Sequence, residues 1–170
     1  QPKLDGVRCV IQRESDFPGQ EYLASFSVKA YSRTGKEWKN IDHILEQLKP
    51  FFFKYPNVIL DGELYNHDLK NDFEKIISLV RKTKPTDEHR LESKEMVQFH
   101  CYDTIMEHMP FDQRIDFIYD NLSASYIHLV ETTQCFTKGD AKVFHKDNLE
   151  MGYEGSIVRT NDVYKCGRSW

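Results

Sequence analysis

Apolar and polar residues alternate in several short stretches of the chain, a period-two pattern that is typical of strands with one buried face. The pattern predicts strands at residues 7–12, 25–31, 58–60, 96–102, 126–130 and 156–158. The segment 14–20 contains Pro18 and Gly19 and is typical of a loop between the first two strands.

Apolar residues three and four positions apart predict helices between these strands. Such stripes lie at residues 41–52, 73–80, 110–122 and 138–149. Asn71 followed by Glu74 resembles a capping box in front of the second stripe. Because strands occur both in succession and between helices, we predict an α+β fold of largely antiparallel sheets flanked by helices.

The composition is that of an ordinary globular protein with one domain, since 39% of the 170 residues are apolar and 29% are charged. The longest apolar runs, such as residues 51–53, are far below the roughly 18 residues that a membrane span needs. No signal peptide is recognisable, and the four cysteines show no metal-binding spacing. We therefore expect an intracellular protein, cytoplasmic or nuclear, with reduced thiols and no membrane association.

The formal net charge of −4 is only a weak argument against a nucleic-acid partner, because a local basic face can coexist with acidic surroundings. The densest basic stretch is Arg81-Lys82-Thr83-Lys84, which is also typical of a solvated helix end. The chain begins with Gln1 inside its most informative motif, so we expect it to be part of a longer protein.

Four clusters of reactive side chains lie at the edges of predicted strands. In the first, residues 3–8, a lysine, a carboxylate and an arginine fall within one short segment. A lysine is a nucleophile only in its neutral form, which a neighbouring cation such as Arg8 or a metal would favour. A surface salt-bridge cluster is the alternative interpretation of the same residues.

The second cluster is Asp61-Gly62-Glu63, directly after a short buried strand. At strand spacing the two carboxylates project from one face, and two like charges need a partner such as a metal or a hydroxylated ligand. A hairpin turn with acidic ends is equally compatible with the pattern.

The third and fourth clusters end the chain's later strands. Tyr102, before Asp103, could stack on a nucleobase or belong to the core. Glu154 could ligate Mg²⁺, a cation that prefers oxygen ligands. Since no glycine-rich phosphate loop is present, phosphate would be held by cationic side chains. The candidates are Arg8, Arg33, Arg159 and Arg168.

Together and in this order, the clusters resemble the covalent nucleotidyltransferases, specifically ATP-dependent DNA ligases of the small phage or viral type. Residues 3–8 match the motif K-x-D-G-x-R, residues 32–35 resemble the short arginine motif, and residues 61–63 match D-G-E. Tyr102-Asp103 falls where the family has an aromatic residue before Asp, and residues 154–159 resemble E-G-x-x-x-R. The resemblance extends over essentially the whole chain.

The resemblance implies that residues 1–170 form an adenylation domain, a nucleotidyltransferase core of the ATP-grasp-like kind, truncated at both ends. The oligonucleotide-binding (OB-fold) domain that follows in the family is absent from the sequence. The family's last motif has two lysines shortly after the element that resembles Gly167-Arg168-Ser169, and the sequence stops before them at Trp170.

The resemblance also implies a three-step reaction in which ATP supplies AMP to Lys3, AMP passes to the 5′-phosphate of a nick, and the 3′-hydroxyl expels it. Glu63 would bind the ribose, Tyr102 would stack on adenine, and Gln1 would help to recognise the adenine edge. The implied catalytic residues are Lys3, Asp5 and Arg8. The implied nucleotide site consists of Gln1, Lys3, Arg8, Arg33, Glu63, Tyr102, Glu154 and Arg168, with Glu63 and Glu154 as Mg²⁺ ligands.

The expected partner is nicked double-stranded DNA, bound by a monomer during DNA replication, repair or recombination. Alternatives within the superfamily are an RNA ligase and an mRNA capping guanylyltransferase, whereas Arg8 argues against an NAD-dependent ligase. A different class of protein is also open: a catalytically silent nucleotide- or nick-binding module that retains the motifs.

Overall fold

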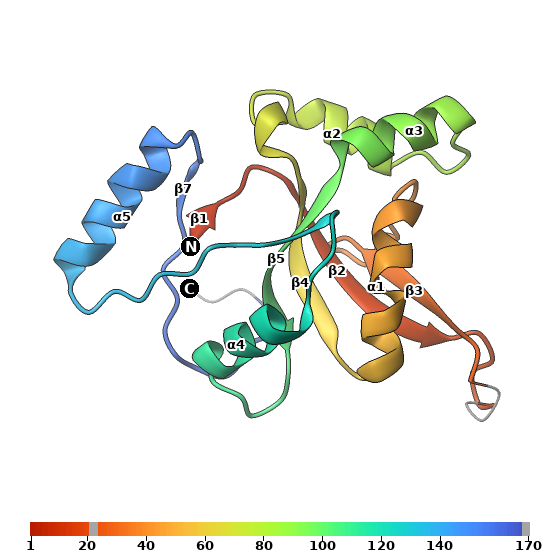
Figure 1. Ribbon diagram of the computed structural model, residues 1–170, viewed down its shortest axis with the longest axis horizontal. Helices are drawn as coiled ribbons and strands as arrows, with labels where there is room; N and C mark the ends of the chain where they lie inside the picture. The colour runs from red at the N-terminus through yellow and green to blue at the C-terminus, as the bar shows by residue number, and fades with distance from the viewer. Residues whose placement is uncertain (21–23, 168–170) are drawn as a thin grey trace.

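The computed structural model describes residues 1–20 and 24–167. A five-stranded sheet lies at its centre in the order β3-β2-β4-β5-β6, and β1 and β7 form a second, two-stranded sheet (Figure 1). The strands are β1 (Pro2–Lys3), β2 (Val7–Ser15), β3 (Phe26–Tyr31), β4 (Ile59–Tyr65), β5 (Gln98–Ile105), β6 (Ile127–Leu129) and β7 (Gly155–Ser156). The helices are α1 (Asp42–Lys54), the 3-10 turn η2 (His67–Leu69), α2 (Phe73–Val80), α3 (Asp87–Met96), α4 (Phe111–Asn121) and α5 (Lys138–Glu150).

The central sheet is antiparallel except at one edge, where β6 runs parallel to β5. The predicted α+β fold with largely antiparallel sheets is therefore confirmed. The middle strand, β4, includes Asp61-Gly62-Glu63, which rules out the hairpin-turn interpretation of that cluster. A β-bulge lies between Asp61 and Gly62 where β4 pairs with β5.

Gly62 is required by the close approach of β5. A Cβ atom at this position would lie 2.2 Å from the carbonyl oxygen of His100 and 2.7 Å from the ring of Phe99. No side chain fits at such distances, so β4 has to carry glycine between Asp61 and Glu63.

One face of the sheet packs against helices. Helix α1 buries Ile44, Leu48, Phe51 and Phe52. The ring of Phe51 lies 6.1 Å from that of Phe117 on α4, so α1 and α4 share one apolar core. Among the described residues, this core contains most of the buried hydrophobic side chains.

Residues of β2 alternate between these two faces. Val7, Cys9 and Ile11 are buried against the helices, whereas Arg8 pairs in register with Glu63 of β4 and points to the opposite face. The motif residues of the central strands are thus separated from the core by the sheet itself.

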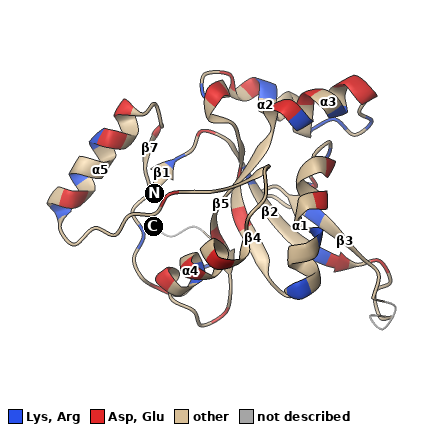
Figure 2. Ribbon diagram, in the orientation of Figure 1, with Lys and Arg blue, Asp and Glu red and all other residues tan. Residues whose placement is uncertain are grey.

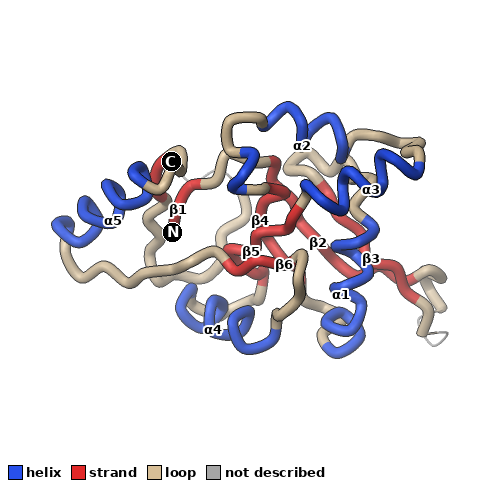
Figure 3. Tube along the Cα trace, turned by 45° about the horizontal axis from the view of Figure 1, so that its top comes forward, coloured by secondary structure: helices blue, strands red, loops and turns tan. Residues whose placement is uncertain are grey.

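Helix α5 and the small β1–β7 sheet lie at one end of the molecule, and β3 and α3 lie at the other, as Figures 1 and 3 both show. Helix α5 is attached to β7 through its polar residues, since the Asn148 side chain donates a hydrogen bond of 2.8 Å to Ser156 Oγ. No residue of α5 is fully buried.

Two local predictions were wrong. Helix α3 was not predicted, because it carries almost no apolar stripe and buries only Ser93. The predicted capping box at Asn71 is not formed, since the N-cap of α2 is Asp72 and makes no side-chain cap bond. Capping boxes do occur at Thr86, before α3, and at Thr137, before α5. In the described part of the chain, no helix is long and apolar enough to span a bilayer.

Candidate active site

Lys3 and Glu154 meet although 151 residues separate them. Strand β1 pairs antiparallel with β7, with Lys3 in register with Gly155. The amide of Glu154 donates to the Lys3 carbonyl at 3.2 Å, and Lys3 Nζ lies 2.5 Å from Glu154 Oε1. Both side chains are about half exposed, at 47% and 46%, so the pair is open to an incoming ligand.

The segment that follows Lys3 lies over two of the other candidate residues. Leu4 packs in a small apolar cluster with Tyr102. A Cβ atom on Gly6 would lie 2.6 Å from the Leu64 carbonyl oxygen and 3.3 Å from Glu63 Oε2, so glycine allows the chain to pass close to Glu63. The lysine motif, Glu63 and Tyr102 therefore lie next to one another in the fold.

Glu63 is an unusual carboxylate. Burial, and then the nearby charge of Asp61, raise its pKa to about 8, so it is largely protonated at pH 7. Its Oε1 accepts a long hydrogen bond of 3.4 Å from the Tyr102 hydroxyl. Its Oε2 is buried without a hydrogen-bond partner among the described residues, so its hydrogen-bonding capacity is unused.

Arg8 is held by a buried carboxylate. Its guanidinium forms two hydrogen bonds to Asp61, at 3.0 and 2.8 Å, and Asp61 is only 2% exposed. Tyr164 completes the arrangement, because its hydroxyl accepts from Arg8 at 3.1 Å and donates to Asp61 at 2.7 Å. The motif arginine is thus fixed in direction, with 40% of its side chain exposed.

Tyr102 is enclosed rather than open. Its side chain is 8% exposed, and the guanidinium of Arg159 lies 5.2 Å from the centre of its ring. Gln1 connects the two residues, since its amide nitrogen donates to the Tyr102 carbonyl at 3.0 Å and its Oε1 accepts from Arg159 at 2.8 Å. For adenine to stack on Tyr102, as the resemblance implies, the Arg159 side chain has to move.

Beside Tyr102, Asp103 anchors a buried ion-pair network that sequence reasoning missed. Arg114 of α4 is 3% exposed and binds Asp103 through two hydrogen bonds, at 2.8 and 3.2 Å. Arg159 binds the same carboxylate at 3.3 Å. An arginine within an apolar helix stripe gave no local signal, and Tyr164 was missed because it lies outside the recognised motifs.

The remaining predicted residues lie at the margin of this arrangement or outside the described residues. Asp5 is exposed beside the site, and its charge contributes to the raised pKa of Glu63. Arg33 is exposed in the tight turn after β3, where the Gly35 amide donates to the Ser32 carbonyl at 3.0 Å. Arg168 lies outside the described residues.

Two of the candidate residues, Glu63 and Glu154, carry carboxylates that could bind a metal ion. Within residues 1–20 and 24–167, no three His, Cys, Asp or Glu side chains are grouped to hold one. Mg²⁺ commonly keeps several waters and uses one or two carboxylates together with substrate phosphates. The exposed Glu154, beside Lys3, fits such a site, whereas Glu63 is only partly exposed.

A cavity lies beside this site, not over the lysine. Its volume is about 580 Å³, and it is bounded by α4, α5, β7 and residues 131–135. Gln1 and Arg159 line it, but Lys3 and Glu63 do not. The lysine–glutamate pair is therefore a surface site with an adjoining groove that begins at Gln1.

With this geometry established, the chain can be compared with known proteins. The sequence model of the family described as "ATP dependent DNA ligase domain" matches residues 1–170. The chain belongs to this family.

The curated relatives include DNA ligases of African swine fever virus. One is 30% identical over 174 residues, covering 98% of this chain and 38% of that protein, and another isolate's is 28% identical over 171 residues, covering 97% and 37%. The chain therefore spans a little over a third of the length of these relatives.

Solved structures show the same fold. A structure titled "Pmar-Lig_PreS3" has a TM-score of 0.71 at 21% identity, over 99% of this chain and 39% of that one. A Chlorella virus DNA ligase-adenylate has a TM-score of 0.59 at 17% identity, over 99% of this chain and 55% of that one.

Proposed function

We propose that this chain is the adenylation domain of an ATP-dependent DNA ligase in which Lys3 becomes covalently attached to AMP. The observation that carries the proposal is the 2.5 Å contact between Lys3 Nζ and Glu154 Oε1, formed by the pairing of the two chain segments with the motifs K-x-D-G-x-R and E-G-x-x-x-R. A carboxylate this close favours the ammonium form of Lys3, so a bound cation that neutralises Glu154 would favour the neutral, nucleophilic nitrogen.

In the first step the Lys3 ammonium, which lies beside Glu154 Oε1, loses its proton to solvent, and the Glu154 carboxylate stays ionised. The nitrogen lone pair forms a bond to the α-phosphorus of ATP, and the bond from that phosphorus to the pyrophosphate oxygen breaks. Pyrophosphate leaves with the electron pair, and AMP remains as a phosphoramidate on Nζ. A covalent intermediate divides one difficult phosphoryl transfer into easier steps.

The other residues orient the nucleotide. The unpartnered Oε2 of Glu63 binds a ribose hydroxyl, which satisfies a buried polar atom. Arg8, held in direction by Asp61, presents its exposed edge to ribose or phosphate. Gln1 binds the adenine edge at the mouth of the adjoining groove.

Mg²⁺ belongs to the same proposal. When bound, it neutralises charge that develops on the transferred phosphate, and Glu154 is the residue here that would hold it. The partner is nicked double-stranded DNA, bound by a monomer. AMP passes from Lys3 to the 5′-phosphate of the nick, whose activated phosphorus is then attacked by the 3′-hydroxyl with release of AMP.

The test is the intact mass of the full-length protein after incubation with Mg²⁺ and ATP, GTP or NAD⁺ separately. We expect a gain of one AMP from ATP alone, lost in Lys3→Ala and retained in Lys146→Ala, an exposed lysine of α5 that serves as the matched control.

The other outcomes separate the alternatives. A GMP adduct would identify a capping guanylyltransferase, and an AMP adduct from NAD⁺ would contradict the cofactor assignment. If nucleotide binds but no adduct forms, the chain is a silent binding module. For an adenylylated protein, sealing of nicked DNA in preference to nicked RNA distinguishes a DNA ligase from an RNA ligase.

A further inference from the structure

Two basic segments that are far apart in the sequence lie side by side in the fold. The first is residues 32–40, which close a hairpin after β3: Tyr31 pairs with Glu37, and the Trp38 amide donates to the Ala30 carbonyl at 2.8 Å. The second is residues 80–86, which connect α2 to α3. Together they contain six Lys or Arg residues and one Glu, in a chain whose net charge is −4.

Hydrogen bonds hold the two segments together. The Lys39 amide donates to the Val80 carbonyl at 2.9 Å. The buried side chain of Asn40 donates to the Leu79 carbonyl at 3.2 Å and to the His89 carbonyl at 3.0 Å. Thr86 then caps α3, so the basic loop is fixed at both ends rather than free in solvent.

We call the resulting surface the basic ridge; it consists of Arg33, Lys36, Lys39, Arg81, Lys82 and Lys84. Figure 2 shows Lys and Arg gathered where α2 leads into α3. Lys39 pairs with Glu37 at 2.8 Å. The other five side chains of the ridge form no ion pair with any carboxylate in the described part of the chain.

The basic ridge begins next to the candidate active site. The indole nitrogen of Trp38 donates to the Arg8 carbonyl at 3.0 Å. Val10 pairs with Tyr31, the last residue of β3 before the turn that carries Arg33. A track of basic side chains therefore leads from Arg8, which is paired with Asp61, past Arg33 and Lys39 to the α2–α3 loop.

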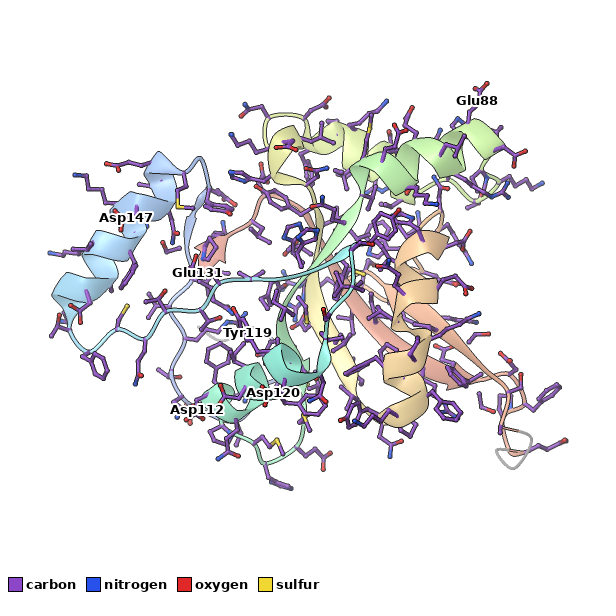
Figure 4. The ribbon with its side chains drawn as sticks, viewed as in Figure 1. Glu88, Asp112, Tyr119, Asp120, Glu131 and Asp147 are labelled. Atoms are coloured by element: carbon purple, nitrogen blue, oxygen red, sulfur yellow. The ribbon has the colours of Figure 1, made fainter. Side chains whose placement is uncertain are left out.

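The charged residues that line the groove at the other end of the molecule are mostly acidic. The 580 Å³ groove between α4 and α5 is lined by Asp112, Asp116, Glu131 and Asp147, with Arg159 as the single Lys or Arg among its described lining residues. Figure 4 labels Asp112, Glu131 and Asp147 on this side. A polyanion near Lys3 is repelled from that groove and attracted to the ridge.

We propose that the basic ridge binds the phosphate backbone of duplex DNA and directs the duplex away from the nick along the α2–α3 loop. The dipole of α2 by itself explains cations at its C-terminus, but it does not explain the second basic segment tied alongside. The choice of duplex DNA as the partner rests on the proposed function. The ridge adds a docking surface for that partner beyond the nucleotide site and the motif arginines.

The test is binding of a 5′-phosphorylated nicked duplex by the full-length protein, measured by fluorescence anisotropy without nucleotide between 50 and 200 mM salt. The variant is Lys82→Gln/Lys84→Gln, and the control is Lys138→Gln/Lys142→Gln on α5, which removes the same charge at the far end of the molecule. Each lost phosphate contact lowers the salt slope of log K by about 0.9.

We expect the ridge variant to bind the nicked duplex about tenfold or more weakly, with a salt slope smaller by about 2. The control is expected to bind like the wild type, and all three proteins form lysyl-AMP equally. A ridge variant that keeps the wild-type affinity and salt slope overturns the proposal. Duplex binding is measured without nucleotide, so a failure of adduct formation contradicts the proposed function alone. The salt dependence of duplex binding then still tests whether the basic ridge binds DNA.

Discussion

The hydroxyl of Tyr164 donates a hydrogen bond of 2.7 Å to Asp61 Oδ2, the same carboxylate oxygen that accepts from Arg8 Nη2 at 2.8 Å. Tyr164 therefore fixes the direction of a motif arginine without belonging to any of the recognised motifs. Its ring also lies 5.6 Å from the guanidinium of Arg114, which connects the Arg8 pair with the Asp103 network.

Tyr164→Phe should slow adenylylation by roughly tenfold, because the exposed edge of Arg8 loses one of its two supports. Loss of one hydrogen bond to a charged group should lower the free energy of unfolding by about 1–3 kcal/mol. The measurements are the rate of lysyl-AMP formation over a range of ATP concentrations, to separate kcat from KM, and chemical denaturation. Tyr119→Phe, which removes a 3.0 Å hydrogen bond to the Val130 carbonyl, is the control. Equal rates for the two variants would contradict a positioning role for Tyr164.

Glu154→Gln should abolish most adenylylation while changing stability by less than about 1 kcal/mol, because the pair with Lys3 is half exposed. The control is Glu150→Gln, whose partner Lys146 lies at 3.6 Å in a more exposed pair on α5. The rate of AMP adduct formation is compared in the two variants. Wild-type rates in Glu154→Gln would remove this carboxylate from the reaction.

Arg114→Met should destabilise the fold by about 3 kcal/mol, because it leaves Asp103 buried with only part of its compensation. Arg90→Met, which breaks an exposed pair with Asp87, should cost less than about 1 kcal/mol. Urea denaturation of both variants gives the comparison. Similar losses would mean that the Asp103 network contributes no more than a surface pair.

Glu63 predicts a dependence of stability on pH. Its pKa is about 8 in the folded protein, above the ordinary value of 4.5, so the folded state holds the proton more tightly than the unfolded state. The stabilisation from this proton is complete below pH 4.5 and is lost as the pH rises to 8, a change on the order of a few kcal/mol. Glu63→Gln lacks the titration and should therefore gain stability relative to the wild type over this interval. Thermal unfolding of both proteins at pH 5 and pH 8.5 measures the effect, and a difference that is the same at both values would disprove it.

Gly62→Ala should prevent normal packing of β4 on β5, since its Cβ would lie 2.2 Å from the His100 carbonyl oxygen. Gly139→Ala in the first turn of α5 meets only Thr137 Oγ1 at 3.4 Å and should be neutral or slightly stabilising. Thermal unfolding of the two variants tests the contrast. An unchanged midpoint in Gly62→Ala would show that the strands can separate without cost.

Local patterns in the sequence were sufficient for the class of fold and for most of its elements. The period-two stretches and helical stripes correspond to the strands of the central sheet and to α1, α2, α4 and α5. Helix α3 was not predicted, because it is mostly exposed and has almost no apolar stripe. It is held by its N-terminal cap and by the hydrogen bond from Asn40 to His89. A periodic spacing of apolar residues indicates a helix with one buried face, and α3 has almost no buried face.

The sequence by itself also indicated which residues are candidates for the reactive site, because the motifs are short and each lies within one segment. Only the tertiary structure decided how these segments meet. It joined Lys3 to Glu154 through β1 and β7, and it supplied Arg114 and Tyr164, which no local pattern had indicated. The physical reason is that a hydrogen-bond or ion-pair partner is chosen by distance in space. Burial then sets the charge state of a carboxylate such as Glu63. Neither the distance between two partners nor the burial of a side chain depends on the neighbouring residues in the chain alone.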